Sequence, residues 1–288
     1  MGSLAAALAR QVTANRSGVG HERDFASHRE RMTEEIAARA PAGGAGRLCL
    51  LGAGNANDVD LDRLTELFSE VHLVDLDPEA LHRALTRVSP AGHRRARLVI
   101  HAPVDLSGIF PHLDGWARTP PDVEAIADAV EAGIGELETR LPGPFDLVVS
   151  CCMLSQLQLV LVEALGERHP RFEELRVAIN HVHVLSLAGL LAPRGVGLLV
   201  TDLTSSETHP PLAALPEGTD LGRLMSDLIH VGNVIAALHP GILSSIIRHD
   251  EDLRALYAVR FPVGPWIWHN GPIQTYLVYG LEIQARKA

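Results

Sequence analysis

Short apolar runs alternate with longer amphipathic segments along the first two hundred residues of the chain. A strand buried on both faces of a parallel sheet is apolar throughout, whereas a helix that covers such a sheet is apolar on one side only. The runs that fit buried strands are 48–51, 71–74, 96–102, 145–151 and 197–203. The segments with helical spacing are 58–68, 78–88, 123–140 and 173–191. This alternation predicts an α/β, doubly wound, mostly parallel sheet with helices on both faces.

The pattern changes after residue 203. Residues 204–265 contain short helical segments separated by prolines, and we expect them to form a helical cap inserted into the fold. Two last apolar runs, 266–268 and 275–283, flank the turn His269-Asn270-Gly271-Pro272. They predict a C-terminal antiparallel hairpin, which completes a seven-stranded sheet.

Residues 1–40 predict a helical arm in front of the Rossmann-like sheet domain, which we place at 41–288. Its arginines make the arm the most basic part of an acidic chain. Such an arm either packs on the core as solvated helices or covers an active site as a lid. Its charge, opposite to that of the whole protein, slightly favours a lid.

The 288 residues carry a formal net charge of −10, with a pI near 5.8. Nucleic-acid-binding domains usually show a basic footprint, so this charge argues against a nucleic-acid partner. The most apolar window, 147–165, is interrupted by polar residues and predicts a strand, a loop and a helix rather than a membrane span. We recognise no signal peptide and expect a cytoplasmic protein.

The three cysteines, Cys49, Cys151 and Cys152, lie in apolar runs without the paired spacing of a zinc site. Buried, reduced thiols are the favoured interpretation, and a redox-active Cys151–Cys152 pair is the alternative. Neighbouring residues in a strand point to opposite faces, which disfavours such a pair.

A glycine turn follows the first predicted strand. Gly52 and Gly54 allow positive φ and let a ligand approach the backbone closely. The second predicted strand ends on Asp75, about where a β-α-β unit places a carboxylate against ribose hydroxyls. The turn and the acid predict a nucleotide-like ligand, and a simple strand–helix cap at Asp75 is the alternative.

The turn also departs from a dinucleotide fingerprint, which would place a third glycine where this chain has Asn57. Asp58, Asp60 and Asp62 are expected to occupy the first turn of the next helix. These acids suit the helix dipole but would repel a pyrophosphate docked on the helix N-terminus. A nucleoside with a sulfonium group therefore fits the turn better than NAD does.

Together these features resemble the class I S-adenosylmethionine-dependent methyltransferase family. The motifs that carry the resemblance are LGAGNANDVDL (51–61), VHLVDLDPEAL (71–81), VDL (104–106), FDLVVSCCMLSQL (145–157) and GLLAPRGVGLLVTDL (189–203). Each motif is weak alone, whereas their order and spacing are specific. Asn57 in place of a small residue and the long segment 107–144 depart from the family pattern, and the latter could reshape the acceptor pocket.

The resemblance implies S-adenosyl-L-methionine as the cofactor, with S-adenosyl-L-homocysteine as the product. Gly52-Ala53-Gly54 would face its methionine part, and Asp75 would hold the ribose hydroxyls. Leu76 and Leu106 would flank the adenine, whose amino group would donate to Asp105. A turn residue is the alternative for Asp105.

The resemblance further implies that Asn55, Asn57 and Asp58 bind the amino or carboxylate group of the methionine part. The segment after the fourth strand would form the floor where methyl donor and acceptor meet, and from it we select Ser150, Cys151, Met153 and Gln156. The acceptor pocket is expected to include Trp266, Trp268 and Tyr276, or these pack in the core of the hairpin. Arg23 and Arg29 of the arm could pair with an acceptor carboxylate or phosphate.

Methyl transfer from a sulfonium needs mainly alignment and desolvation, so the sequence is free to lack a catalytic signature. We find none. His209 and His269 are candidate bases because histidine titrates in the useful range, although most histidines lie on surfaces or helix ends. His181 and His183 are two apart on a predicted helix and do not share a face, so no metal site is expected there.

The leading hypothesis is a methyltransferase that moves a methyl group to an O or N atom of a small molecule by in-line displacement. A non-catalytic cofactor-binding subunit, an NAD-dependent oxidoreductase and an aminopropyl transferase are the alternatives. The acidic helix start argues against the oxidoreductase, and the absence of an acid in SCCMLSQL argues against the aminopropyl transferase. We expect no nucleic-acid or membrane partner and allow for a homodimer.

Overall fold

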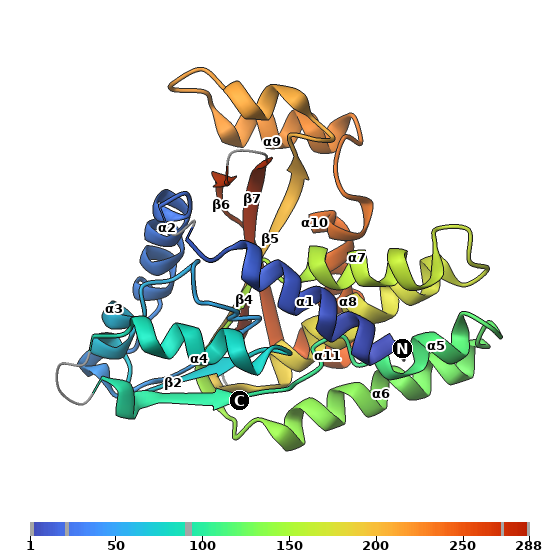
Figure 1. Ribbon diagram of the computed structural model, residues 1–288, viewed down its shortest axis with the longest axis horizontal. Coiled ribbons are helices and arrows are strands. Elements are labelled where there is room, and N and C mark those ends of the chain that lie inside the picture. Colours follow the sequence, from blue (N-terminus) through green and yellow to red (C-terminus); the bar gives the residue numbers. More distant parts are fainter. Residues whose placement is uncertain (1–2, 21–22, 90–93, 272–273, 287–288) are drawn as a thin grey trace.

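The computed structural model describes residues 3–20, 23–89, 94–271 and 274–286. A seven-stranded sheet with the order β3-β2-β1-β4-β5-β7-β6 runs through its centre (Figure 1). The strands are β1 (Arg47–Leu51), β2 (Glu70–Val74), β3 (Leu98–His101), β4 (Phe145–Cys151), β5 (Leu191–Ser205), β6 (Tyr257–Asn270) and β7 (Gln274–Ala285). The pairs from β3 to β5 are parallel, and β7 is antiparallel to both of its neighbours. The predicted mostly parallel sheet with a C-terminal hairpin is confirmed.

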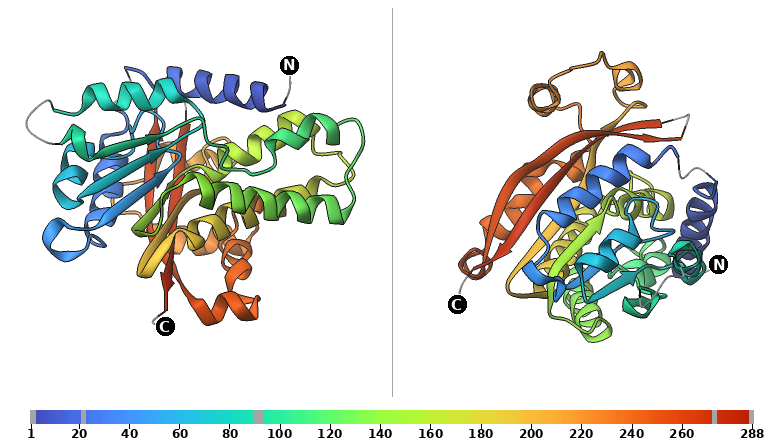
Figure 2. Two further views of the ribbon diagram at one scale, coloured as in Figure 1. Left: turned by 90° about the horizontal axis from the view of Figure 1, so that it is seen from below. Right: turned by 90° about the vertical axis from the view of Figure 1, so that its left-hand side faces the viewer.

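Helices cover both faces of the sheet (Figure 2). Alternate residues of β1 enter opposite cores, since Leu48 and Leu50 pack on one face and Cys49 and Leu51 on the other. The first face is covered by α2 (Ala26–Ala37), α3 (Leu61–Leu67) and α4 (Pro78–Arg87). The second is covered by α6 (Val123–Arg140), α7 (Leu154–Leu165), α8 (Phe172–Gly189) and α10 (Pro240–Arg248). This arrangement is the doubly wound fold that the apolar pattern predicted.

The remaining helices connect or extend these layers. They are α1 (Ser3–Ser17), α5 (Leu113–Trp116), α9 (Leu221–His230) and α11 (Glu251–Leu256). Short 3-10 turns add η1 (Ala42–Gly44), η2 (Arg95–Arg97), η3 (Phe110–His112), η4 (Pro210–Ala214) and η5 (Ala236–Leu238). α9 lies beyond the carboxyl end of β5, at the top of Figure 1. No helix among the described residues is both long and apolar enough to cross a bilayer.

The acids before α3 differ from the prediction. The helix begins at Leu61, because the Asp60 side chain accepts a hydrogen bond from the Arg63 N–H and thereby forms the N-cap. Asp58 precedes the helix, and only Asp62 lies in its first turn. The prediction that three acids occupy the first helical turn is therefore wrong, and Asp58 is free to serve a different site.

Strands β5 and β6, which flank the helical cap in the chain, are both longer than predicted. β5 continues to Ser205, and β6 begins at Tyr257, so the helical cap is shorter than the predicted 204–265. The ladder between β6 and β7 shifts between Arg260 and Val263 and again between Val263 and Trp266. Pro262 and Pro265 lie in these intervals and have no N–H to donate. The prolines hid the strand from sequence reasoning, whereas pairing with β7 establishes it.

A close contact between two glycines packs α6 against the loop after β3. A Cβ added to Gly133 would lie 2.7 Å from the Cα of Gly108, which is backbone and cannot move aside cheaply. Gly108 itself has a φ of +69° and lies against Val182 of α8. On the same helix, a Cβ on Gly135 would meet no atom within 4 Å.

These two glycines of α6 should respond oppositely to the same substitution. We expect Gly133→Ala to lower the free energy of unfolding by about 1–3 kcal/mol, because the methyl group overpacks the contact. Gly135→Ala should raise it by roughly 0.5–1 kcal/mol through helix propensity alone. Urea denaturation of both variants measures the difference, and equal effects would show that the close contact does not limit packing.

Candidate functional site

The strand order reverses at β1, since the chain proceeds from β1 to β2 and β3 on one side and then to β4 and β5 on the other. In open α/β sheets, ligands bind outside the carboxyl ends of the strands at such a switch point. A cavity of about 550 Å³ lies there, within the size range of ligand pockets. Its walls come from the turn after β1, the ends of β4 and β5, the N-terminal arm and the β6–β7 hairpin.

The cavity brings together about half of the residues predicted from the sequence. Those that line it are Gly52, Ala53, Gly54, Asn55, Asn57, Asp58, Cys151, Gln156, Trp268 and Tyr276. Asp75, Leu76, Leu106, Ser150, Met153 and Trp266 are buried outside its lining, and Asp105, which is half-buried, also lies outside it. Arg23, Arg29, His209 and His269 also lie outside the lining.

The glycine turn needs left-handed backbone at three positions. Gly52 and Gly54 have φ values of +75° and +49°, which glycine adopts without strain. A Cβ on Gly52 would lie 2.7 Å from the Sδ of Met153, so Met153 packs directly against the turn. Ala56 also has a positive φ of 53°. The third left-handed position is therefore residue 56, one residue before the position of the dinucleotide fingerprint.

Asp75 ties this turn to the end of β2. Its Oδ2 accepts from the Gly54 N–H at 2.8 Å, and its Oδ1 accepts from the Asp77 N–H at 2.9 Å. The carboxylate is fully buried, and burial raises its pKa to about 6 in spite of these hydrogen bonds. Each carboxylate oxygen retains a further lone pair, so Asp75 can still accept from a hydroxyl that reaches it.

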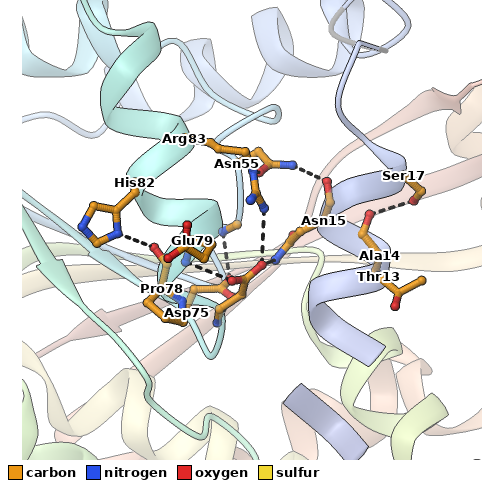
Figure 3. A network of polar contacts seen from close by, with 12 residues as sticks. Thr13, Ala14, Asn15, Ser17, Asn55, Asp75, Pro78, Glu79, His82 and Arg83 are labelled. Carbon is orange, nitrogen blue, oxygen red and sulfur yellow. Dashed lines mark hydrogen bonds and ion pairs between the residues drawn. The ribbon is translucent and has the colours of Figure 1, made fainter. Parts of the chain in front are cut away.

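The N-terminal arm is hydrogen-bonded to the same region (Figure 3). Asn15 of α1 donates through Nδ2 to the Asp77 Oδ2 at 3.0 Å, and its backbone carbonyl accepts from the Asn55 Nδ2 at 2.6 Å. Arg83 of α4 donates to the Asn55 Oδ1 at 2.9 Å. Asn57 likewise donates to the Gly18 carbonyl at 3.2 Å. The two asparagines of the turn therefore hold the arm, in addition to lining the cavity.

Asp105 occupies the corresponding position after β3. Its Oδ1 accepts from both the backbone N–H and the hydroxyl of Ser107, at 2.8 and 2.7 Å. Its Oδ2 is buried and has no hydrogen-bond partner among the described residues. Burial raises the pKa of Asp105, and such an orphaned oxygen is costly unless a donor reaches it.

Ser150 supports the sheet from behind the cavity. Its hydroxyl lies 2.7 Å from the His183 Nε2, and His183 also bonds the backbone of Leu106. Burial lowers the pKa of His183 to about 4, so the imidazole is neutral at physiological pH. This buried bridge holds the end of β4 next to the loop after β3, which explains why Ser150 itself is not exposed to the cavity.

Aromatic and polar side chains pack beside Asp58. The Trp266 Nε1–H donates to the His28 Nδ1 at 3.0 Å, so a neutral His28 carries its proton on Nε2. That nitrogen lies 3.4 Å from the Asp58 Oδ1, and the His28 ring stacks on Trp268 at 4.6 Å between centroids. Trp266 thus supports the site from behind, whereas Trp268 and Asp58 line it.

Asp202 of β5 is a cavity residue that sequence reasoning did not select. It is 3% exposed, and its Oδ1 accepts from the Ser155 hydroxyl at 3.2 Å. Burial raises the pKa of Asp202 to about 6. Tyr276 also lines the cavity and stacks on Trp268 at 5.0 Å between centroids. The sequence did contain a signal for Asp202, because it is a charged residue within the otherwise apolar predicted strand that ends in VTDL (200–203).

The remaining candidates have other surroundings. His209 lies within hydrogen-bond distance of Asn233, and His269 of Thr275. Arg29 donates to the Asn57 carbonyl at 3.1 Å, on the outer side of the glycine turn. The three cysteines are free and buried, and burial raises the pKa of each thiol. In the described part of the chain, no three His, Cys, Asp or Glu residues gather in a group that could hold a metal ion.

Asp202 should make folding stability depend on pH. Its folded-state pKa of about 6 exceeds the ordinary value of 3.8, so its contribution favours folding most below pH 4 and is lost as pH rises through 6. We expect Asp202→Asn to raise the free energy of unfolding at pH 7.5 by up to about 3 kcal/mol and to have little effect at pH 4. Urea denaturation at both pH values measures this, with exposed Asp227→Asn as the control. Destabilisation by Asp202→Asn at both pH values would contradict the raised pKa.

No protein-family model matches the sequence, and a search of curated proteins finds no match. Several solved structures resemble the chain. Magnesium protoporphyrin IX methyltransferase from Synechocystis PCC 6803, with bound SAH, is 12% identical with a TM-score of 0.45, covering 92% of this chain and 86% of that one.

Two further solved structures show similar values. N-methyltransferase NodS from Bradyrhizobium japonicum WM9, in complex with S-adenosyl-l-homocysteine, is 13% identical with a TM-score of 0.43, covering 90% of this chain and 87% of that one. An arsenic(III) S-adenosylmethionine methyltransferase from Chlamydomonas reinhardtii is 16% identical with a TM-score of 0.40. The match covers 86% of this chain and 66% of that one. Similarities at this level identify neither substrate nor cofactor for this chain.

Proposed function

We propose that the protein is an S-adenosylmethionine-dependent methyltransferase that acts on an O or N atom of a small molecule. The observation that carries this proposal is the charge of the cavity at the switch point. Asp58 and Asp202 both line it, and Arg10 is the one arginine or lysine among the described residues of the lining. Arg10 is already paired with Glu163 of α7. An acidic cavity above a glycine turn suits a cationic nucleoside and disfavours a pyrophosphate.

The residues present fit such a cofactor. Gly52 and Gly54 give the turn its left-handed backbone, and a ligand that approaches the turn closely would replace the contacts of Met153 and Asn15. Asp75 lies at the end of β2 with lone pairs still available, as a ribose diol requires. The orphaned Oδ2 of Asp105 lies at the end of the next strand and matches an adenine amino group as donor.

The role of this chain would be to align and desolvate the reactants. The sulfonium of S-adenosylmethionine supplies an activated methyl carbon, so no metal or covalent intermediate is required. Gly52-Ala53-Gly54 would hold the methionine part, and Asp58, which lies 3.4 Å from the His28 Nε2, would pair with its ammonium group. Trp268, Tyr276 and Gln156 would exclude water and position the acceptor. Asp202 is the buried cavity carboxylate available as a base, in place of His209 or His269.

The N-terminal arm would act as a lid over this site. Asn15 contributes three contacts there, one each with Asn55, Asp77 and the region of Gly54, where a Cβ would lie 2.9 Å from its Oδ1. α1 also packs on η3, which follows Asp105 closely in the chain. Because the arm bonds Asp77, two residues after Asp75, and packs on η3 after Asp105, it would open to admit the nucleoside and close on it.

Binding of S-adenosylhomocysteine tests the proposed cofactor. We expect saturable binding in isothermal titration calorimetry, with Asp75→Ala weakening the affinity by roughly 1–3 kcal/mol, the scale for losing a buried charged acceptor. Asp128→Ala, which removes an exposed carboxylate from α6, is the matched control and should leave the affinity unchanged. If neither S-adenosylhomocysteine nor S-adenosylmethionine binds at high micromolar concentration, the proposed function is wrong.

Hydrogen exchange tests the lid. With saturating S-adenosylhomocysteine, the backbone amides of α1 should exchange more slowly, because the arm closes on the ligand. The amides of α9, which lies apart from the glycine turn, serve as the internal control and should be unaffected. Ligand binding without any change in α1 would show that the arm is a fixed part of the fold.

A further inference from the structure

The cavity has a second end, away from the glycine turn, that is formed by the β6–β7 hairpin and the end of β5. Trp268 and Tyr276 supply stacked rings there, and Phe25 of the segment before α2 packs against Trp268 at 5.6 Å between centroids. Aromatic faces attract cations through the ring quadrupole, more strongly where water is excluded. This end of the cavity therefore offers an aromatic wall. Within it the buried Trp268 ring is also stacked by His28, so the less buried Tyr276 ring is the better face for a cation.

Asp202 supplies the charge beside this wall. Among the described residues, no lysine or arginine forms an ion pair with it. Its side chain accepts a hydrogen bond from Ser155, and attraction to His28 lowers its pKa, but burial outweighs both. A carboxylate can accept about four hydrogen bonds, so most of its capacity is unused. Burying a charge without a partner is expensive, which indicates that a ligand completes this site.

The rest of the lining gives independent support. The Trp268 Nε1–H is buried and has no hydrogen-bond partner among the described residues, but an ammonium ion has no lone pair to accept from it, so this group does not bear on the charge of the ligand. Asn270, Gln274 and Gln156 are neutral and can accept from an N–H donor. An acceptor that carries a carboxylate or phosphate would meet the like charge of Asp202.

We infer that the methyl acceptor is an amine, held as an ammonium ion between the Trp268–Tyr276 wall and the Asp202 carboxylate, and that Asp202 takes its proton. This inference rests on the proposed function and names its substrate class. A phenol or alcohol is the competing acceptor, because the same carboxylate could deprotonate a hydroxyl group.

The proposed reaction balances in protons and electrons. The ammonium transfers one proton to Asp202, which frees the nitrogen lone pair. A C–N bond then forms as the C–S bond of the sulfonium breaks, and the electron pair of that bond goes to sulfur. The products are an N-methylammonium ion and a neutral thioether, and protonated Asp202 returns its proton to water.

Cation binding tests the inference on the intact protein saturated with S-adenosylhomocysteine. We use benzyltrimethylammonium, which cannot be methylated, with benzyl alcohol as the neutral probe and phenylacetate as the anionic probe. At pH 8, calorimetry should show benzyltrimethylammonium binding at least tenfold more tightly than either of the others. Asp202→Asn should lower the affinity for benzyltrimethylammonium at least tenfold, while the affinity for S-adenosylhomocysteine changes less than twofold. Asp227→Asn should change neither affinity.

A second pair of variants covers the case in which Asp202→Asn does not fold. Tyr276→Phe keeps the ring and should retain cation affinity, whereas Tyr276→Leu should lower it at least fivefold. Equal binding of the cation and the alcohol, absence of cation binding, or full cation affinity in folded Asp202→Asn would overturn the amine assignment and leave the methyltransferase proposal standing. Failure of S-adenosylhomocysteine itself to bind would instead overturn the proposed function.

Discussion

The Asp75 carboxylate is the link on which the rest of the site depends. It joins the Gly54 N–H of the turn after β1 to the Asp77 N–H that begins α4, and it does so without contact with solvent. The raised pKa shows that burial outweighs the two hydrogen bonds. The fold keeps a group that would be more favourable in water, which is typical of a functional position rather than of a purely structural one.

Several other parts of the structure pack around Asp75 and the glycine turn. The left-handed turn at Gly52 and Gly54 opens the backbone, and the arm closes over it through Asn15. Behind the cavity, His183 and the Trp266–His28 pair hold β4 and Asp58 in place. Around the cavity, Asp105 Oδ2, Trp268 Nε1, Asp58 Oδ1 and His28 Nε2 are buried and have no hydrogen-bond partner among the described residues, although the last two lie 3.4 Å apart.

The fold was largely predictable because its signals are local. Buried parallel strands need uninterrupted apolar runs, and α6 was predicted with the bounds that the structure shows, Val123–Arg140. The failures have equally local causes. The Asp60 cap moves the start of α3 past Asp58, and Pro262 and Pro265 conceal strand β6, which exists because β7 pairs with it.

The sequence by itself determined the sheet, the glycine turn and the acids at the strand ends, because each depends on neighbouring residues in the chain. Only the tertiary structure decided which side chains share the cavity. Trp268 and Tyr276 pair across the hairpin that the sequence predicted. Asp202 joins them only through the pairing of β5 with β7, which no spacing in the sequence encodes. The tertiary structure also placed Asn15 of the arm on the glycine turn, some 40 residues away. The turn could therefore be recognised from the sequence, whereas the acidic, aromatic character of the opposite wall appears only when β5, β6 and β7 pair.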